Sequence, residues 1–325
     1  MILKKIKTYN FFLIFGFICF AVTGCSSKTV VLEPQVKYGN PSQDHIKDIP
    51  QIRYKEESDS AQSESNQGDK LPELNADEYE KLGDAMLSNG KYFIAFMQYE
   101  NSLKENKGNL RVEYKKGVAL LGANKLKEAQ KQFQQVLQKK PDFAPAHEGM
   151  GRVNFKSRQY HIAKADFKKA VGLDPVLWRS YNYLGNLYDL DKEYDLAVRN
   201  YKTAITIRPD KGFLYNNLGV SLYMADKYQD AVESFYKALK LGYASRKIYN
   251  NLGRTFVDME LYDKALEAFK KGGSEAVAYN NVGVGLLNSG KTDKAAQYFR
   301  KAIELSPQFY VQANENLKKC RLKQK

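Results

Sequence analysis

Small and aromatic residues recur along the chain with a fixed period from about residue 75 onward. Glycines are separated by 34 residues five times and then by 30, and they are Gly83, Gly117, Gly151, Gly185, Gly219, Gly253 and Gly283. An alanine follows each glycine after 12 residues, and an aromatic residue follows each alanine after four more. A repeat of this length indicates copies of one supersecondary unit that stack on one another.

Apolar positions inside one unit follow the helical period twice. Between Trp178 and Lys211 the two sets are Trp178, Tyr181, Leu184, Gly185 and Tyr188, and then Ala197, Tyr201 and Ala204. Pro209 ends the second set, because proline cannot continue the hydrogen-bond ladder of a helix. The pattern predicts a helical hairpin in which glycine faces alanine at a close contact and the aromatic ring fills the space behind them.

This combination of glycine, alanine, aromatic residue and proline resembles the tetratricopeptide repeat. The resemblance implies an all-α solenoid of about seven helical hairpins over residues 75–325. The sixth unit lacks four residues, and Gly272-Gly273-Ser274 stands where other units complete their second helix. A terminal helix is expected after Pro307, with one apolar face formed by Tyr310, Ala313, Leu317 and Cys320. Such a helix closes the stack on one side and meets water on the other.

The start of the chain has the pattern of an export signal. Lys4, Lys5 and Lys7 precede the apolar run 11–22, which is too short to span a membrane. The following Val22-Thr23-Gly24-Cys25 resembles the lipobox of bacterial lipoproteins. That resemblance implies cleavage after residues 1–24 and a diacylglyceryl and acyl anchor on Cys25. An ordinary secretory signal or an uncleaved anchor is the alternative. In a bacterium with two membranes, Ser26 favours the outer membrane facing the periplasm, because an inner-membrane retention signal usually has Asp there.

The segment 25–74 shows no sustained periodicity. Its stretch 56–69 holds almost no apolar residue, so burial cannot offset the entropy of ordering the backbone. We expect a disordered linker with a reach of roughly 40 Å. It would tether the folded array to the membrane.

The net charge and the lack of catalytic motifs limit the kinds of function that the chain can have. The net charge is +14, and residues 76–325 carry all of it, because the signal and the linker cancel. A basic body favours anionic protein, lipid or cell-wall partners, while the export signal argues against nucleic acid. The histidines His45, His147 and His161 are scattered, and no catalytic or metal-binding motif occurs. We therefore expect no enzyme activity, cofactor or metal. Removal of the signal leaves Cys25 and Cys320, so no internal disulfide is expected once Cys25 is acylated.

Asparagine pairs recur in the first helices of units four to seven. Asparagine is a mediocre helix former that can donate and accept at once, so its recurrence favours contacts to the backbone of an extended ligand. Asn217, Asn251 and Asn281 resemble the asparagine ladder of tetratricopeptide proteins that hold peptides. The full candidate groove comprises Arg179, Asn182, Asn186, Asn216, Asn217, Tyr223, Lys247, Asn250, Asn251, Arg254, Asn280 and Asn281.

Two further interpretations concern these residues. A two-carboxylate clamp would need Lys, Asn, Asn, Lys and Arg, and this chain matches three of the five positions with Asn186, Asn217 and Lys247. A generic grip on an extended or acidic peptide therefore fits better. The amides could instead be solvated or bond neighbouring helices after duplication of one ancestral unit.

The architecture is similar to that of tight-adherence and type IV pilus assembly lipoproteins. That similarity implies a membrane-anchored adaptor that binds a protein segment during envelope assembly. A self-associating scaffold, or an adaptor for cell-wall hydrolases or outer-membrane assembly, is the alternative.

Overall fold

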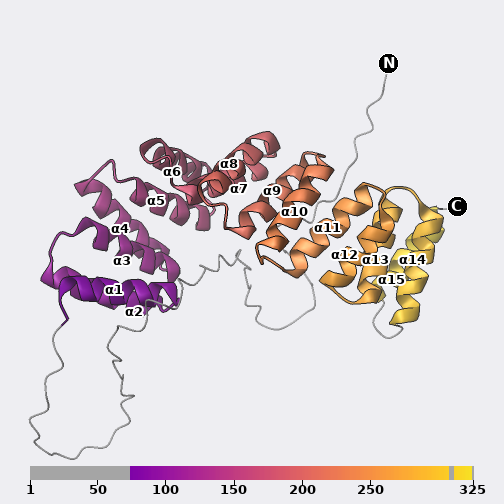
Figure 1. Ribbon diagram of the computed structural model, residues 1–325, viewed down its shortest axis with the longest axis horizontal. Helices are drawn as coiled ribbons and strands as arrows, with labels where there is room; N and C mark the ends of the chain where they lie inside the picture. Colours follow the sequence, from indigo (N-terminus) through magenta and orange to yellow (C-terminus); the bar gives the residue numbers. More distant parts are fainter. Residues whose placement is uncertain (1–73, 307–310, 324–325) are drawn as a thin grey trace, which may run out of the picture. The chain divides into compact units, whose positions relative to one another are not determined.

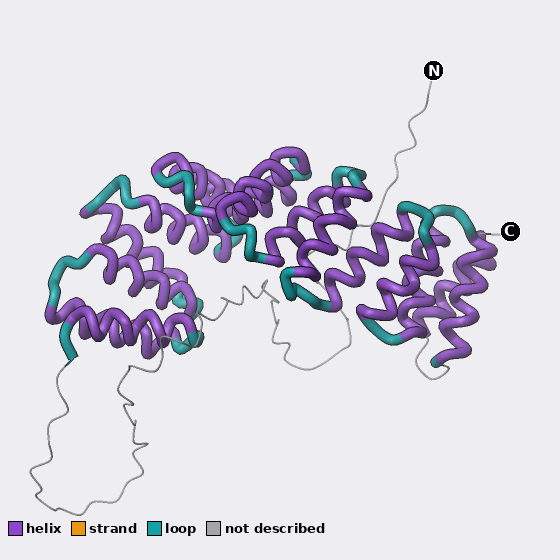
Figure 2. The backbone as a smooth tube through the Cα atoms, viewed as in Figure 1, coloured by secondary structure: helices purple, strands orange, loops and turns teal. Residues whose placement is uncertain are grey.

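A computed structural model of the protein describes residues 74–306 and 311–323. Within those ranges it contains fifteen α-helices and no β-strand (Figures 1 and 2). The chain divides into two units, and the helices belong to the larger one, Pro72–Leu87 with Lys91–Lys325, except for Ser88. The helices are α1 (Ala76–Ser88), α2 (Tyr92–Glu105), α3 (Leu110–Gly122), α4 (Leu126–Lys139), α5 (Ala144–Lys156), α6 (Tyr160–Leu173), α7 (Trp178–Leu190), α8 (Tyr194–Ile207), α9 (Gly212–Met224), α10 (Tyr228–Lys240), α11 (Arg246–Asp258), α12 (Tyr262–Gly272), α13 (Glu275–Asn288), α14 (Thr292–Leu305) and α15 (Val311–Lys323).

The repeats fold as helical hairpins, as the sequence pattern predicts. From α3 to α13, each odd-numbered helix packs against the even-numbered helix that follows it. We call these the first and second helices of a unit. Consecutive first helices also contact each other from α3 to α15, so they form one continuous layer along the array.

The turn inside the hairpins has a constant backbone conformation. In units two to seven, a residue with positive φ stands seven positions after the repeat glycine: Asn124, Arg158, Lys192, Asp226, Glu260 and Gly290. The next residue donates its N–H to a carbonyl five positions earlier, as Glu193 does to Tyr188 at 2.8 Å. This Schellman ending satisfies carbonyl groups at the end of the first helix and reverses the chain direction.

The repeat glycines make room for the aromatic ring of the second helix. A Cβ on Gly219 would lie 2.6 Å from the ring of Phe235, and all seven repeat glycines meet their aromatic residue in this way. The expected contact of glycine with alanine was therefore incomplete, because the ring itself lies directly on the glycine. The seven aromatic residues are at most 3% exposed, and the seven alanines are fully buried.

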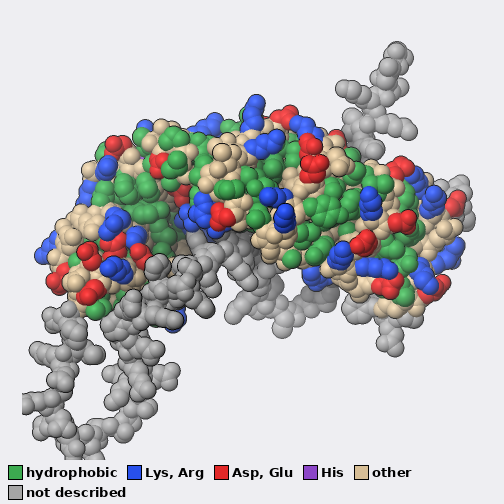
Figure 3. Space-filling model, in the orientation of Figure 1, with side chains coloured by type: hydrophobic (Ala, Val, Ile, Leu, Met, Phe, Trp, Pro, Cys, Tyr) green, Lys and Arg blue, Asp and Glu red, His purple; other side chains and the backbone are tan. Residues whose placement is uncertain are grey.

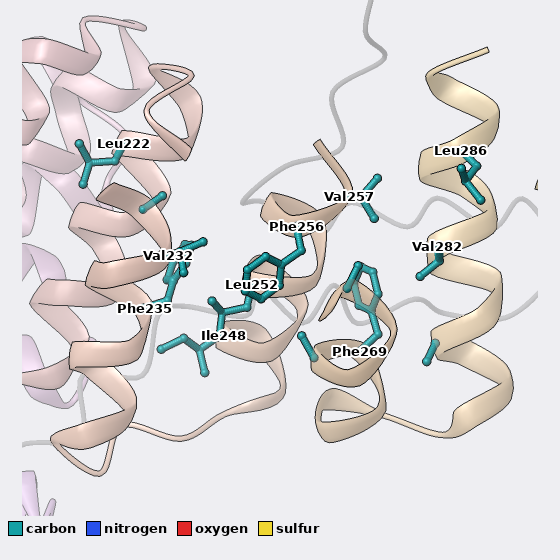
Figure 4. Packing of buried hydrophobic residues seen from close by; sticks show 14 of the residues in the cluster. Leu222, Val232, Phe235, Ile248, Leu252, Phe256, Val257, Phe269, Val282 and Leu286 are labelled. Carbon is teal, nitrogen blue, oxygen red and sulfur yellow. The ribbon is translucent and has the colours of Figure 1, made fainter. Parts of the chain in front are cut away.

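The core continues from one unit to the next. One cluster of buried side chains extends from Ala197 to Cys320. Figure 4 shows part of it, with Phe269 between the helices that carry Val257 and Val282. Because each unit shares its core with its neighbours, stability is expected to depend on interfaces between units as well as on single hairpins.

The shortened sixth unit brings two first helices unusually close. Helix α12 has 11 residues, whereas the other second helices have 13 or 14. In α13, Gly285 lies so close to Val257 of α11 that a Cβ there would overlap the valine side chain. Gly285 thus permits an approach that a larger residue would prevent.

Helix α15 closes the array as a first helix without a second one. Its buried side contains Ala313, Leu317 and Cys320. Asn316 bonds Asn280 of α13 in the same way as the corresponding asparagines of earlier units, described below. That register places Lys318 where the other first helices have glycine, and Lys318 is exposed. The side that would meet a second helix is therefore charged and solvated.

The signal segment, Cys25 and most of the linker lie outside the described residues, so the lipid anchor and the tether stay predictions. Among the helices of the described ranges, none combines the length and apolar character needed to span a bilayer. Those ranges also hold no group of three or more metal-ligating side chains.

Candidate functional site

Asparagine side chains connect the first helices of consecutive units. In each bond, the donor stands two places before the repeat glycine, or before Lys318 in α15, and the acceptor stands three places before the repeat glycine of the preceding unit. The bonds run from Asn217 Nδ2 to Asn182 Oδ1 at 3.0 Å, from Asn251 Nδ2 to Asn216 Oδ1 at 3.4 Å, and from Asn316 Nδ2 to Asn280 Oδ1 at 3.3 Å. The acceptors Asn182 and Asn280 are 7% and 5% exposed. We call this set the amide ladder. It gives these asparagines a structural role between neighbouring helices.

Charged residues take the same register at the start of the array. Lys115 donates to Glu80 Oε1 at 2.6 Å, and Arg111 donates to Glu80 Oε2 at 2.7 Å. Burial alone would raise the pKa of Glu80, but the hydrogen bonds from Lys115 and Arg111 outweigh burial and lower it. An ion pair therefore joins the first two units where amides join the later ones. This equivalence was not predicted from the sequence, although Glu80 and Lys115 have the spacing of 35 residues that also separates Asn182 from Asn217 and Asn216 from Asn251.

Asn186 contacts a tyrosine hydroxyl that binds a carboxylate, and Tyr223 carries such a hydroxyl itself. The hydroxyl oxygen of Tyr201 lies 2.5 Å from Oδ1 of Asn186, and this hydroxyl donates to Asp189 at 2.8 Å. Tyr223 donates to Asp258 of the next first helix at 2.6 Å. Burial and the bond to Asp258 raise the pKa of Tyr223, so this phenol stays protonated at neutral pH.

The other candidates lie around the amide ladder. The guanidinium of Arg179 stacks 4.5 Å from the ring centroid of Trp178. Asn250 faces the shortened end of α12, because a Cβ on Gly272 would lie 2.9 Å from its Oδ1. Asn281 is half-buried, while Lys247 and Arg254 of α11 are exposed to solvent. The candidate groove thus combines amides held by one another with two accessible cations.

Figure 3 shows one face of the array, on which hydrophobic side chains lie among clusters of both charges. Individual exposed apolar residues occur on first and second helices alike, with Leu190 of α7 at 40% and Tyr236 of α10 at 53%. Exposed apolar area alone therefore does not single out one layer of helices as a binding surface.

Removal of one amide from the ladder should destabilise the array. Asn217→Ala leaves the buried carbonyl oxygen of Asn182 without its donor, which should lower the free energy of unfolding by about 1–3 kcal/mol. The double variant Asn182→Ala/Asn217→Ala should lose less than the sum of the two single variants. Urea unfolding followed by circular dichroism measures both. Asn288→Ala, an exposed asparagine at the end of α13, is the control, and an equal loss there would contradict a structural ladder.

Comparisons with known proteins agree with this fold. Sequence models described as tetratricopeptide repeat match residues 149–212, 214–242, 247–272 and 276–309. Among curated protein sequences, none matches the chain.

The solved structures that are similar to this chain are distant from it in sequence. The Cut9 and Hcn1 hetero-tetramer of the APC/C is similar with a TM-score of 0.53 and 20% identity, over 75% of this chain and 49% of that chain. This chain therefore spans about half the length of that relative. PilF of Pseudomonas aeruginosa has a TM-score of 0.49 at 20% identity, over 66% of this chain and 97% of that chain. YrrB, described as a TPR protein with an unusual peptide-binding site, has a TM-score of 0.48 at 22% identity, over 57% of this chain and 97% of that chain.

The constant hairpins, the glycine–aromatic contacts and the four matching sequence stretches agree with one another. The chain carries tetratricopeptide repeats stacked as an all-α solenoid.

Proposed function

We propose that the protein is a membrane-anchored scaffold that holds an extended segment of a partner protein on the first helices α7 to α13. The observation that carries the proposal is the amide ladder, whose asparagines join α7 to α9, α9 to α11 and α13 to α15 at a constant register. An asparagine has two N–H donors and a carbonyl acceptor, and each ladder bond from Asn217 or Asn251 uses one N–H. The partly exposed members keep further capacity for the peptide groups of a ligand. Because the ladder fixes their orientation, less entropy is lost on binding.

The charges beside the ladder favour an acidic segment. Lys247 and Arg254 lie exposed on α11 and flank Asn251 in the sequence. Two cations on one helix attract carboxylates over a distance of roughly 8–10 Å at physiological salt. An acidic, extended peptide fits both the amides and these cations.

The anchor places this activity in the cell envelope. Acylation of Cys25 would hold the array at the outer membrane, facing the periplasm, with the linker as a tether. The lipobox-like Val22-Thr23-Gly24-Cys25 supports this part of the proposal. Assembly of a pilus or a secretion system is the process that we propose, on the similarity to pilus assembly lipoproteins. Labelling of the wild type, but not of Cys25→Ser, with an alkyne fatty acid tests the anchor.

A peptide array tests the binding surface. The purified chain should bind acidic peptides of ten to fifteen residues in preference to the same peptides with Asn and Gln in place of Asp and Glu. Lys247→Glu/Arg254→Glu should weaken binding about tenfold or more, because two attractive contacts become repulsive. Lys202→Glu/Lys237→Glu makes the same charge change on the second helices α8 and α10 and should leave binding unchanged. Equal losses in both variants would show that only net charge matters.

A further inference from the structure

A hollow of about 510 Å³ lies between α2, α3 and α4, away from the amide ladder. Its walls include Leu103 of α2, Glu113 and Lys116 of α3, and Gln132, Gln135 and Gln138 of α4. The three glutamines follow one another at intervals of three residues, so they project from the same side of α4. The hollow therefore separates the second helices of units one and two.

The hollow has a cause in the repeat pattern. Four positions before the repeat glycine, five units carry a tyrosine, the third carries His147, and the second carries Glu113. In unit seven the tyrosine, Tyr279, lies 5.7 Å from the ring of Tyr298 on α14 and 5.6 Å from the ammonium of Lys270 on α12. A tyrosine ring thus fills the space between consecutive second helices there. The shorter Glu113 leaves the corresponding space open in unit two.

Glu113 also lacks part of its hydrogen bonding. The residue is 9% exposed, and its Oε1 accepts a bond from Lys139 at 2.5 Å. Its Oε2 is buried and has no hydrogen-bond partner. A buried acceptor without a donor is costly, so a guest that brings a donor gains affinity from it. Rotation of the carboxylate exchanges the two oxygens, and Lys139 is half exposed and free to adjust.

This chain repeatedly pairs a tyrosine hydroxyl with a carboxylate. The pairs between different helices are Tyr99 with Asp84 at 2.8 Å, Tyr201 with Asp189 at 2.8 Å, and Tyr223 with Asp258 at 2.6 Å. Lysine ammonium groups also stand over tyrosine rings, as that of Lys164 does over Tyr188 at 4.0 Å from the ring centroid. Glu113 can offer the first of these contacts to a phenol in the hollow. Lys116 also lines the hollow, where its ammonium forms an ion pair with Glu100 at 2.6 Å.

We propose that this hollow binds a tyrosine side chain of a partner protein. The ring takes the place that Tyr279 of the chain itself occupies in unit seven, and the hydroxyl donates to Glu113. The site is separate from the first-helix surface, and a partner that reaches both would gain affinity from two linked contacts.

The test uses the purified full chain and p-cresol, the analogue of the tyrosine side chain. In a titration with p-cresol, the amide chemical shifts of α2, α3 and α4 should change. Toluene should bind at least about tenfold more weakly, because it lacks the hydroxyl donor. Glu113→Tyr restores the residue of the other units and should abolish these shifts while the helical circular dichroism is retained. Glu113→Gln keeps the shape of the side chain and removes its charge, so it should weaken the binding of p-cresol several-fold.

Three results would overturn the proposal. If toluene binds as tightly as p-cresol, the hydroxyl does not contribute to binding. If p-cresol causes the same chemical-shift changes in Glu113→Tyr as in the wild type, it binds elsewhere. Perturbation of the same helices by maltose but not by p-cresol would assign the glutamine-lined hollow to a saccharide. None of these results bears on acidic peptides at α11, so the two proposals fail independently.

Discussion

Replacement of Phe235 by alanine should lower the free energy of unfolding by about 3–5 kcal/mol. The ring is fully buried, and it lies on Gly219 within the cluster that runs from Ala197 to Cys320. Its removal opens a cavity that the glycine cannot fill, because glycine has no side chain to move into the space. Urea unfolding followed by circular dichroism measures the loss.

The neighbouring Tyr236 provides the control for this prediction. It stands on the same helix and is 53% exposed. Tyr236→Ala should change the free energy of unfolding by less than about 0.5–1 kcal/mol, because little packing is lost. Similar losses in Phe235→Ala and Tyr236→Ala would contradict the packing of the ring against Gly219.

Asp189→Asn should stabilise the protein near neutral pH relative to the wild type. Burial raises the pKa of Asp189 from its usual 3.8 to about 6, although bonds from the hydroxyls of Ser221 and Tyr201 act in the opposite direction. The folded state therefore holds this proton more tightly than the unfolded chain. Its contribution to stability is fully present below pH 3.8 and is lost as the pH rises through 6. The difference between the folded pKa of about 6 and the usual 3.8 corresponds to up to about 3 kcal/mol of the free energy of unfolding.

Unfolding in urea at pH 4, 5, 6 and 7 tests this pH dependence. The free energy of Asp189→Asn minus that of the wild type should rise through this range and level off above pH 6. Asp263→Asn, which changes an exposed carboxylate on α12, should show a nearly constant difference. A flat difference for Asp189→Asn would show that this carboxyl is ordinary in the folded state.

The repeat period was sufficient to predict the hairpins and their number. The glycine, alanine and aromatic columns report contacts inside one unit, where spacing along the chain determines which faces meet. The contact of the ring with the glycine was harder to predict from the sequence. Gly219 and Ala231 are both small, and sequence alone does not show which of them the ring of Phe235 covers.

Contacts between units were harder to predict. The recurrence of asparagine at the positions of Asn182 and Asn217 was visible in the sequence. However, Asn217 stands two places before its repeat glycine and Asn182 stands three, and this offset depends on the rotation between successive first helices. For the same reason the ion pair of Lys115 with Glu80 was not recognised as a member of the ladder. The hollow beside Glu113 could have been found from the sequence, because that position is tyrosine in five other units.

The ladder serves stability and, in our proposal, binding as well. Alanine variants of Asn217 or Asn251 would therefore confound the two roles, since a partly unfolded array also loses its partner. Arg254 is exposed on α11 and makes a better probe of binding.

Site-specific photocrosslinking in the intact cell envelope tests the central claim most directly. A photoreactive residue at Arg254 on the first-helix layer should form a discrete crosslink to a partner protein other than this chain. The same residue at Lys237 on α10 should not form that crosslink. A product that appears only from Lys237, or a product from Arg254 that contains two copies of this chain, would contradict partner binding on the first helices.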